Sequence, residues 1–340
     1  MSITYMWLQF LGLGCIIGVA GYHLSYYADI IAEQTGLGRN WIGLILLATV
    51  TSLPELMAGI SAVRFADDPN LAVGDILGSC VFNLTLVFVL DLMHRDTSVY
   101  CKATMGHILS GALGMILISF VGFALIISPI FPKFALGHMG VFAVAIPVFY
   151  LLAMRLLYTF ENKSKSTVSI IKEVDSDRTT LKNACIYFGI AALFVIGAGM
   201  LLPFVGEKII IVMGWNSAFV GTIFMAFATS LPEIAVTVSA IRLRAVELAF
   251  SNVLGSNLFN IVILTVDDVF YTKGQLFKVV APSHVITAFS AVMMTGLVLV
   301  ALIQPPQRRI LNTVSILSVL VVAVFFLNAY IVFTAGQHTL

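Results

Sequence analysis

The sequence predicts an all-α, polytopic membrane protein with ten transmembrane helices, arranged as two inverted five-helix repeats with the N-terminus outside. Two observations carry this prediction. Of the 340 residues, 60% are hydrophobic and only 10% are charged, whereas a soluble domain carries about 25% charged residues. In addition, the phrase Thr-Ser-Leu-Pro-Glu occurs twice in matched apolar surroundings, at 51–55 and at 229–233.

Ten stretches of the chain are long enough to span a bilayer, which takes about 20 apolar residues each. Hydropathy predicts spans at about 5–30, 41–63, 70–93, 104–127, 138–160, 182–206, 215–240, 246–268, 280–303 and 310–334. The first stretch has neither a basic leader nor a cleavage pattern, so we expect it to be retained as a span. The hydrophilic run 161–181 is too short to fold alone and is interpreted as a connector between the halves 1–160 and 182–340.

The distribution of Lys and Arg predicts the orientation. With the N-terminus outside, thirteen of the eighteen basic residues fall in cytoplasmic loops, several of them in the connector. Cytoplasmic loops of membrane proteins carry such an excess. We therefore expect a cytoplasmic connector. The basic residues are otherwise scattered singly, so no nucleic-acid partner is expected, and no feature of the sequence indicates an obligate protein partner.

The second half of the chain repeats the first. Segments 43–64 and 221–242 are identical at eleven of 22 aligned positions, and segments 71–83 and 248–260 at seven of 13. The repeats cover about 41–93 and 215–268. They lie five spans apart, an odd number, so they enter the membrane from opposite sides. Inverted repeats of this kind are typical of secondary transporters, whose substrate site lies near the bilayer midplane between the halves.

Each Thr-Ser-Leu-Pro-Glu phrase is predicted to break its span. Pro54 and Pro232 lack an amide hydrogen, so the helix should end just before each of them. The carbonyls released at 48–50 and 226–228 would then need protein or an ion as partners, because lipid offers none. A simpler alternative is a capping box, in which Ser52 caps the second half-helix and Glu55 completes its first turn.

Glu55 and Glu233 are predicted near mid-membrane, with no Lys or Arg in the middle of their spans. Such carboxylates are costly, so they are either protonated or neutralised by a mobile cation. Further oxygen-bearing side chains follow each copy at helical spacing: Asp75, Ser79 and Asn83 after the first, and Asn252, Ser256 and Asn260 after the second. An alternative is that these residues only bridge helices. As a set of hard oxygens they favour Ca²⁺ or Na⁺ over zinc or copper.

Two other groups of residues receive no functional role from the sequence. The four cysteines show no paired spacing, so neither a disulfide framework nor a zinc site is expected. Asp91 and Asp268 continue the two oxygen-bearing stripes toward the span ends and stay unassigned.

The two repeated blocks resemble the α1 and α2 repeats of the sodium/calcium exchanger, or cation/calcium antiporter, superfamily. The short connector makes the chain similar to the prokaryotic branch, which implies a multi-pass protein of the prokaryotic inner membrane. The resemblance also implies four central ion sites and alternating access, in which the first and sixth spans slide against the other eight. The ligands it implies, with Asp75 added as a further candidate, are Glu55, Glu233, Thr51, Ser52, Thr229, Ser230, Ser79, Asn83, Ser256 and Asn260, and the carbonyls of Ala48 and Ala226.

The function implied by the resemblance is exchange of Ca²⁺ for Na⁺, without a cofactor. Two departures leave the counter-ion open: Asn260 stands where some sodium-coupled members carry Asp, and Asp75 stands where the second repeat has Asn252. An alternative is H⁺ as counter-ion, although the proton-coupled branch usually has His after the glutamate and this chain does not. A cation channel is a further alternative. No enzyme activity is expected, because the buried serines lack a base.

Overall fold

The computed structural model describes residues 3–34, 48–94, 98–131, 135–164, 179–242, 245–306, 308–310 and 313–337. Eight of its helices are long and apolar enough to cross a membrane. They are α1 (Ile3–Gln34), α5 (Pro69–Met93), α6 (Met105–Ile127), α7 (Val141–Ser164), α8 (Leu181–Met213), α12 (Val246–Phe270), α14 (Ser283–Ile303) and α15 (Ile316–Gln337). Each coincides with one predicted span, which confirms an all-helical, multi-pass membrane protein.

The two remaining predicted spans are broken. The first consists of α3 (Ala48–Thr51), α4 (Leu53–Ser61) and the π-helical turn η2 (Ala62–Ala66). The second consists of α9 (Ser217–Phe219), η5 (Val220–Met225), α10 (Ala226–Thr229) and α11 (Leu231–Arg242), and it bends by 47° at Ser230. The predicted start of the first, 41–47, and most of the connector, 165–178, lie outside the described residues, so the count of ten, the division into halves and the orientation stay predictions.

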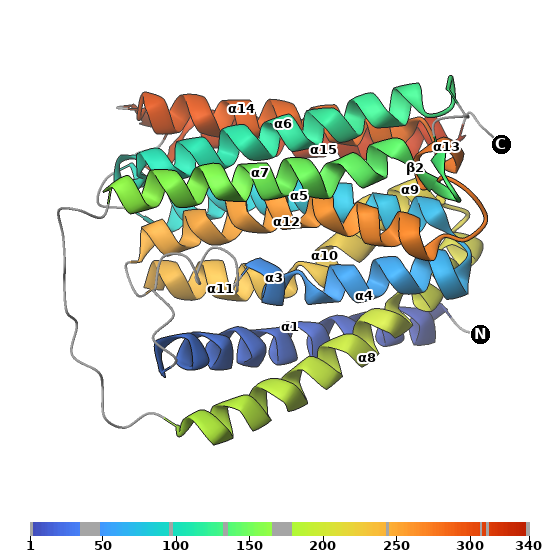
Figure 1. Cartoon of the computed structure of the whole chain (residues 1–340), viewed down its shortest axis with the longest axis horizontal. Coiled ribbons are helices and arrows are strands. Elements are labelled where there is room, and N and C mark those ends of the chain that lie inside the picture. Colours follow the sequence, from blue (N-terminus) through green and yellow to red (C-terminus); the bar gives the residue numbers. More distant parts are fainter. Residues whose placement is uncertain are drawn as a thin grey trace.

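The helices are arranged in layers around the two broken spans (Figure 1). Helices α1 and α8 pack against each other along one flank, and the broken spans separate them from α5 and α12, beyond which α6, α7, α14 and α15 lie. From the middle of the bundle, α4 and α11 lead away in opposite directions, as inverted repeats require. We call the end where α1 begins the N-terminal face, and the end where α7 ends and α8 begins the connector face.

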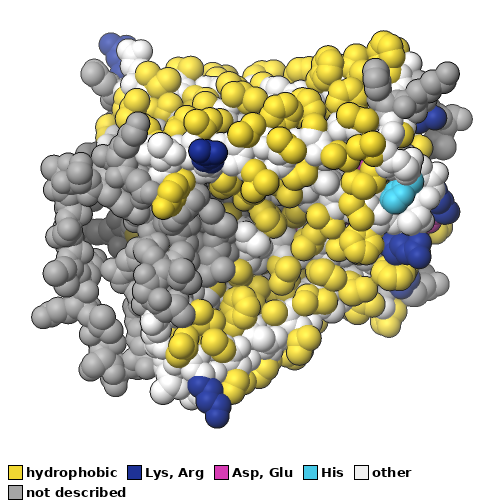
Figure 2. All heavy atoms as spheres, viewed as in Figure 1, with side chains coloured by type: hydrophobic (Ala, Val, Ile, Leu, Met, Phe, Trp, Pro, Cys, Tyr) yellow, Lys and Arg dark blue, Asp and Glu magenta, His cyan; other side chains and the backbone are white. Residues whose placement is uncertain are grey.

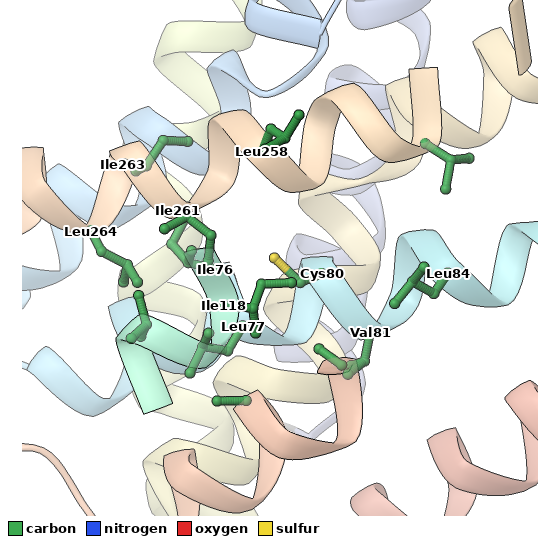
Figure 3. Packing of buried hydrophobic residues seen from close by; sticks show 14 of the residues in the cluster. Ile76, Leu77, Cys80, Val81, Leu84, Ile118, Leu258, Ile261, Ile263 and Leu264 are labelled. Carbon is green, nitrogen blue, oxygen red and sulfur yellow. The ribbon is translucent and has the colours of Figure 1, made fainter. Parts of the chain in front are cut away.

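Apolar side chains dominate both the flank and the interior of the bundle. Figure 2 shows hydrophobic side chains covering the visible flank, with the Lys and Arg side chains mostly toward its two ends. Figure 3 shows buried hydrophobic residues on and around α5 and α12, among them Ile76, Leu77, Cys80, Val81 and Leu84 of α5, and Leu258, Ile261, Ile263 and Leu264 of α12. Lipid tails are as apolar as these side chains, so close packing, not release from water, holds the helices together.

Glycines allow the closest approaches between the repeats. A Cβ atom on Gly78 of α5 would lie 2.4 Å from the carbonyl oxygen of Thr222 in η5. A Cβ on Gly221 would lie 2.7 Å from the carbonyl oxygen of Leu71. No real Cβ sits that close to a backbone atom, so α5 and η5 are in backbone contact, which small residues at membrane helix interfaces permit. This contact brings the polar face of α5 against the broken span of the other repeat.

Helices α1 and α8 meet the broken spans through a second pair of glycines. A Cβ on Gly21 of α1 would lie 2.3 Å from Cγ of Pro232, and a Cβ on Gly199 of α8 would lie 3.1 Å from the carbonyl oxygen of Pro54. Gly21 and Gly199 are separated by 178 residues, the same offset as Pro54 and Pro232. Each of the two flanking helices therefore packs a glycine directly against the proline in the other half of the chain.

Two short hairpins, which the sequence analysis did not predict, close opposite ends of the bundle. β1 (Ala135–Leu136) pairs antiparallel with β2 (Met139–Gly140), and β3 (Arg309–Ile310) pairs antiparallel with β4 (Val314–Ser315). The first hairpin precedes α7 and the second precedes α15. The remaining short elements are η3 (Val99–Lys102) and α13 (Leu276–Val279).

Asp91 and Asp268, which the sequence left unassigned, hold these hairpins. Asp268 of α12 accepts hydrogen bonds from the amides of Gly140 (2.8 Å) and Leu276 (2.6 Å). Asp91 of α5 accepts from the amide of Ser315 (2.6 Å) and also contacts the guanidinium of Arg309 (3.3 Å). Each aspartate therefore sits at the end of one repeat and binds a hairpin that belongs to the other half of the chain.

We expect Asp268→Asn to lower the thermal unfolding temperature of the purified protein by a few degrees. The substitution places an amide N–H₂ opposite one of the two backbone donors, and a hydrogen bond to a charged group contributes about 1.5–3 kcal/mol. The control is Asp67→Asn, which removes an exposed ion pair with Lys273; such pairs contribute little. Equal shifts in the two variants would contradict the role given to Asp268.

Candidate functional site

In both broken spans the helix ends and restarts at the predicted position. Helix α3 ends at Thr51 and α4 starts at Leu53, while α10 ends at Thr229 and α11 starts at Leu231. The prediction that a break precedes each proline is therefore confirmed. In a helix, each backbone N–H donates to the carbonyl four residues earlier. Because Pro54 has no N–H, the carbonyl that loses its helical donor is that of residue 50, not that of Ala48.

The carbonyls of Ala48 and Ala226 are correspondingly not released by the prolines, which corrects the expectation for these two positions. The Ala48 oxygen accepts the amide of Ser52 (3.2 Å) and the hydroxyl of Thr51 (3.3 Å). The Ala226 oxygen accepts the amide of Ser230 (3.0 Å) and lies 3.4 Å from the Thr229 hydroxyl. A carbonyl oxygen has two lone pairs, so either oxygen needs the threonine hydroxyl to turn away before it can bind an ion.

The serines of the two phrases reach across to the glutamate of the other repeat. Ser52 Oγ donates to Glu233 Oε1 (3.3 Å), and Ser230 Oγ donates to Glu55 Oε1 (3.0 Å). The Ser52 side chain makes no capping hydrogen bond to its own helix. The capping-box interpretation is therefore wrong for Ser52, and the crossed contacts place both carboxylates between the two breaks.

The second blocks complete the same centre with their own hydroxyls. Ser79 Oγ lies 3.3 Å from Glu55 Oε1 and 3.1 Å from Ser230 Oγ. In the pseudo-symmetric position, Ser256 Oγ lies 3.3 Å from Thr51 Oγ1. We call the residues in these contacts, together with Thr229 beside Ser230, the central cluster; its eight members are Thr51, Ser52, Glu55, Ser79, Thr229, Ser230, Glu233 and Ser256.

Three other candidates lie one helical turn from Ser79 or Ser256 of the central cluster. The Thr229 hydroxyl donates to Asp75 Oδ1 (2.9 Å), which ties Asp75 to it. The Asn83 amide donates to Asn257 Oδ1 of the other repeat (3.2 Å). Neither polar atom of the Asn260 side chain has a hydrogen-bond partner among the residues that the structure describes. All thirteen candidate residues are at most 2% exposed, so the structure brings the whole predicted set into the interior.

The centre contains buried oxygens that have no hydrogen-bond partner in the part of the chain that the structure describes. They are Glu55 Oε2, Glu233 Oε2, Asp75 Oδ2, Asn83 Oδ1, and Oδ1 of Asn252 and of Asn260. Native proteins pair the large majority of their buried polar atoms, and an unpaired buried carboxylate is especially costly. A hard cation ligated by oxygen fits this set.

A soft metal fits the described residues poorly. Among them, no three His, Cys, Asp or Glu side chains converge on one point. The four cysteines are free, and Cys80 alone of them is buried. The donor atoms at the centre are thus carboxylate, hydroxyl and amide oxygens, which zinc and copper do not favour.

Asp267 is a polar residue of the interior that the sequence analysis missed. It is fully buried on α12, and within the described ranges neither of its carboxylate oxygens has a hydrogen-bond partner. Sequence alignment of the repeats directed attention to its neighbour Asp268, because Asp268 matches Asp91 whereas Asp267 matches Leu90. The sequence signal that could have revealed Asp267 is an acidic residue in an apolar span, at a position where the other repeat has a leucine.

Two inverted repeats, each broken at its proline, that jointly bury an oxygen-lined centre define a secondary membrane transporter, not an enzyme. The family model described as sodium/calcium exchanger protein matches residues 5–159 and 183–337. The chain belongs to this family.

Three individual proteins illustrate the likeness. The inner membrane protein YrbG of Escherichia coli is 24% identical over 255 residues, covering 74% of this chain and 76% of that protein. The sodium/calcium exchanger MaX1 of Methanosarcina acetivorans is 27% identical over 290 residues, covering 77% and 81%. The solved structure of the sodium-calcium exchanger NCX_Mj, soaked with Na⁺ and Sr²⁺, superposes with a TM-score of 0.60 at 19% identity, covering 96% of this chain and 98% of that one. At this identity, the structural likeness concerns the fold.

Proposed function

We propose that this protein exchanges Ca²⁺ for Na⁺ across the membrane, by alternating access at the central cluster. One observation carries the proposal: the hydroxyls of Ser52 and Ser230 cross to Glu233 and Glu55 of the opposite repeat. The ion site is therefore shared, and neither repeat completes it alone. A rearrangement that moves one repeat relative to the other changes the access to the site.

The charge at the centre supports antiport. No positively charged side chain contacts Glu55 or Glu233 among the ion pairs of the described residues. Moving an uncompensated carboxylate through a dry interior costs several kcal/mol, and each 1.4 kcal/mol is a factor of ten in population. Only a cation-loaded centre should therefore reorient, so the exit of one ion requires the entry of another.

The contacts of α1 and α8 support the same mechanism. These helices lie on one flank and touch the broken spans at Pro232 and Pro54 through glycines. Small residues leave a smooth contact surface, along which the helix pair moves without disturbing side chains of the centre. In the proposed cycle, α1 and α8 slide past the prolines and open the central cluster to each face in turn.

Asp75 favours one alternative counter-ion. It is a third buried carboxylate beside the centre, at a position where the second repeat has Asn252, and an unpaired carboxylate in the interior readily takes a proton. Exchange of Ca²⁺ for H⁺ through the same cluster is therefore the second candidate. The two candidates share the site and differ in the ion that returns.

Flux measurements separate the candidates. In proteoliposomes containing the purified protein, we expect an outwardly directed Na⁺ gradient to drive ⁴⁵Ca²⁺ uptake at constant pH. A pH gradient in sodium-free buffer should drive little uptake. The reverse pattern would establish H⁺ as the counter-ion. Ca²⁺ current that persists without any counter-ion would reject antiport in favour of a channel.

A further inference from the structure

Asp267 places a carboxylate outside the central cluster, against the broken span of the other repeat. A Cβ on Gly59 of α4 would lie 2.4 Å from Asp267 Oδ1 and 2.7 Å from Oδ2. The carboxylate therefore occupies the space beside the Gly59 backbone that any larger residue would fill. Asp267 is 0% exposed, and none of the described residues donates a hydrogen bond to either of its oxygens. A group this costly calls for a ligand.

Asp75 lies at the same level of the bundle. It precedes Ser79 by one turn on α5, and Gly59 follows Glu55 by one turn on α4. Helix α5 starts at the N-terminal face and α4 leads toward it, so both residues are one turn nearer to that face than the central cluster. Asp75 Oδ1 accepts the hydroxyl hydrogen of Thr229 in the central cluster (2.9 Å). Asp75 thus joins the level of Asp267 to the centre.

The pseudo-symmetric location on the connector side is built differently. The positions that correspond to Asp75, Gly59 and Asp267 are Asn252, Thr237 and Leu90. There the Asn252 amide donates to the Thr237 hydroxyl (3.1 Å), and Leu90 is fully buried. A hydrogen bond and an apolar side chain therefore replace the two carboxylates. The acidic pair exists on one side of the centre only.

We propose that Asp75 and Asp267 form a second Ca²⁺ site, which the ion occupies between the N-terminal face and the central cluster. Three carboxylate oxygens are free there, Asp75 Oδ2 and both oxygens of Asp267. Ca²⁺ takes six to eight oxygen ligands, so an ion at this site keeps part of its water. An ion that enters from the N-terminal face thus loses part of its water at this pair and the rest at the central cluster. The inference rests on the proposed function, because it assigns the same cargo to the central cluster.

Equilibrium ⁴⁵Ca²⁺ binding to the full chain in detergent tests the site without transport. We expect two Ca²⁺ per wild-type chain and one in the Glu55→Gln, Glu233→Gln double variant. Adding Asp267→Asn to the double variant should remove the remaining ion. Gly59→Ala displaces the Asp267 carboxylate but keeps its charge, so it should lower the affinity for this ion at least tenfold. Glu247→Gln, at an exposed position of the same helix, is the control and should keep both ions.

The proposal fails if the double variant binds no Ca²⁺, or if its remaining ion survives both Asp267→Asn and Gly59→Ala. A sided flux assay provides a second readout. In vesicles of the two opposite orientations, Asp267→Asn should raise the Ca²⁺ concentration for half-maximal flux about tenfold at the N-terminal face and leave the connector face unchanged. An equal rise at both faces would overturn the one-sided role. A wild-type chain that binds two ions but shows no counter-ion-driven flux would instead reject the exchange function alone.

Discussion

Glu55→Gln and Glu233→Gln are each expected to reduce Na⁺-driven Ca²⁺ flux by at least about 100-fold. Each glutamate supplies a fully buried carboxylate with one oxygen free for an ion. Gln keeps the shape but removes the charge that balances the cation. Loss of one partner from a buried charge pair costs about 3–5 kcal/mol, which corresponds to roughly a 100- to 4000-fold loss of affinity. The measurement is initial ⁴⁵Ca²⁺ uptake into proteoliposomes.

The matched control for these variants is Glu247→Gln. It makes the same change at an exposed position of α12, far along the helix from Asn260. Its flux should equal that of the wild type. Thermal unfolding of all three variants in detergent verifies that they fold. Normal flux in either Glu55→Gln or Glu233→Gln would exclude the central cluster as the ion site.

Gly21→Ala is expected to reduce the transport rate by about tenfold or more while Ca²⁺ binding is retained. The added Cβ would lie 2.3 Å from Cγ of Pro232, whereas carbon atoms pack at about 3.5–4.0 Å. Neither the proline ring nor the helix backbone yields easily, so α1 must shift away from α11. Overpacking of this kind costs about 1–3 kcal/mol. Movement of α1 past the proline should therefore be hindered, and turnover falls.

The other flanking helix supplies a graded comparison. On α8, a Cβ on Gly199 would lie 3.1 Å from its nearest neighbours in α4, so Gly199→Ala should reduce turnover less than Gly21→Ala. Gly12→Ala on α1 and Gly197→Ala on α8 meet nothing within 4 Å and serve as controls. Equal turnover in all four variants would contradict sliding of α1 and α8 over the prolines. Equilibrium ⁴⁵Ca²⁺ binding distinguishes a blocked movement from a damaged site.

Much of the fold was predictable because hydropathy and repetition act over long stretches. The spans expected at 70–93 and 246–268 match α5 and α12 within two residues. A proline alone does not decide the outcome, because Pro147 and Pro203 lie inside the continuous helices α7 and α8. Both breaks were predicted correctly because Pro54 and Pro232 stand in a repeated polar phrase. The hairpins were not predicted. Their strands are two residues each, and their positions depend on the distant side chains of Asp91 and Asp268.

Membership of the centre was predictable from repetition, but the individual bonds were not. The crossed contacts of Ser52 with Glu233 depend on how the two breaks face each other, which local spacing does not contain. The capping box failed for this reason, since a carboxylate of the other repeat takes the Ser52 hydroxyl. Asp267 was missed because repeat alignment favours residues that match. The offset shared by Gly21 and Gly199 was present in the sequence, by contrast, and extending the alignment to the first span would have revealed it.

Each hairpin is bound by an aspartate from the other half of the chain, and this has a consequence for biosynthesis. The partners of Asp91 are the amide of Ser315 and the guanidinium of Arg309. Both residues are synthesised more than two hundred residues after Asp91. Until then the first half inserts with a carboxylate lacking its final partners, and only the last hairpin secures it. The hairpin of the first half, in turn, waits for Asp268. Two separately expressed halves should consequently be degraded alone and accumulate only when they are produced together.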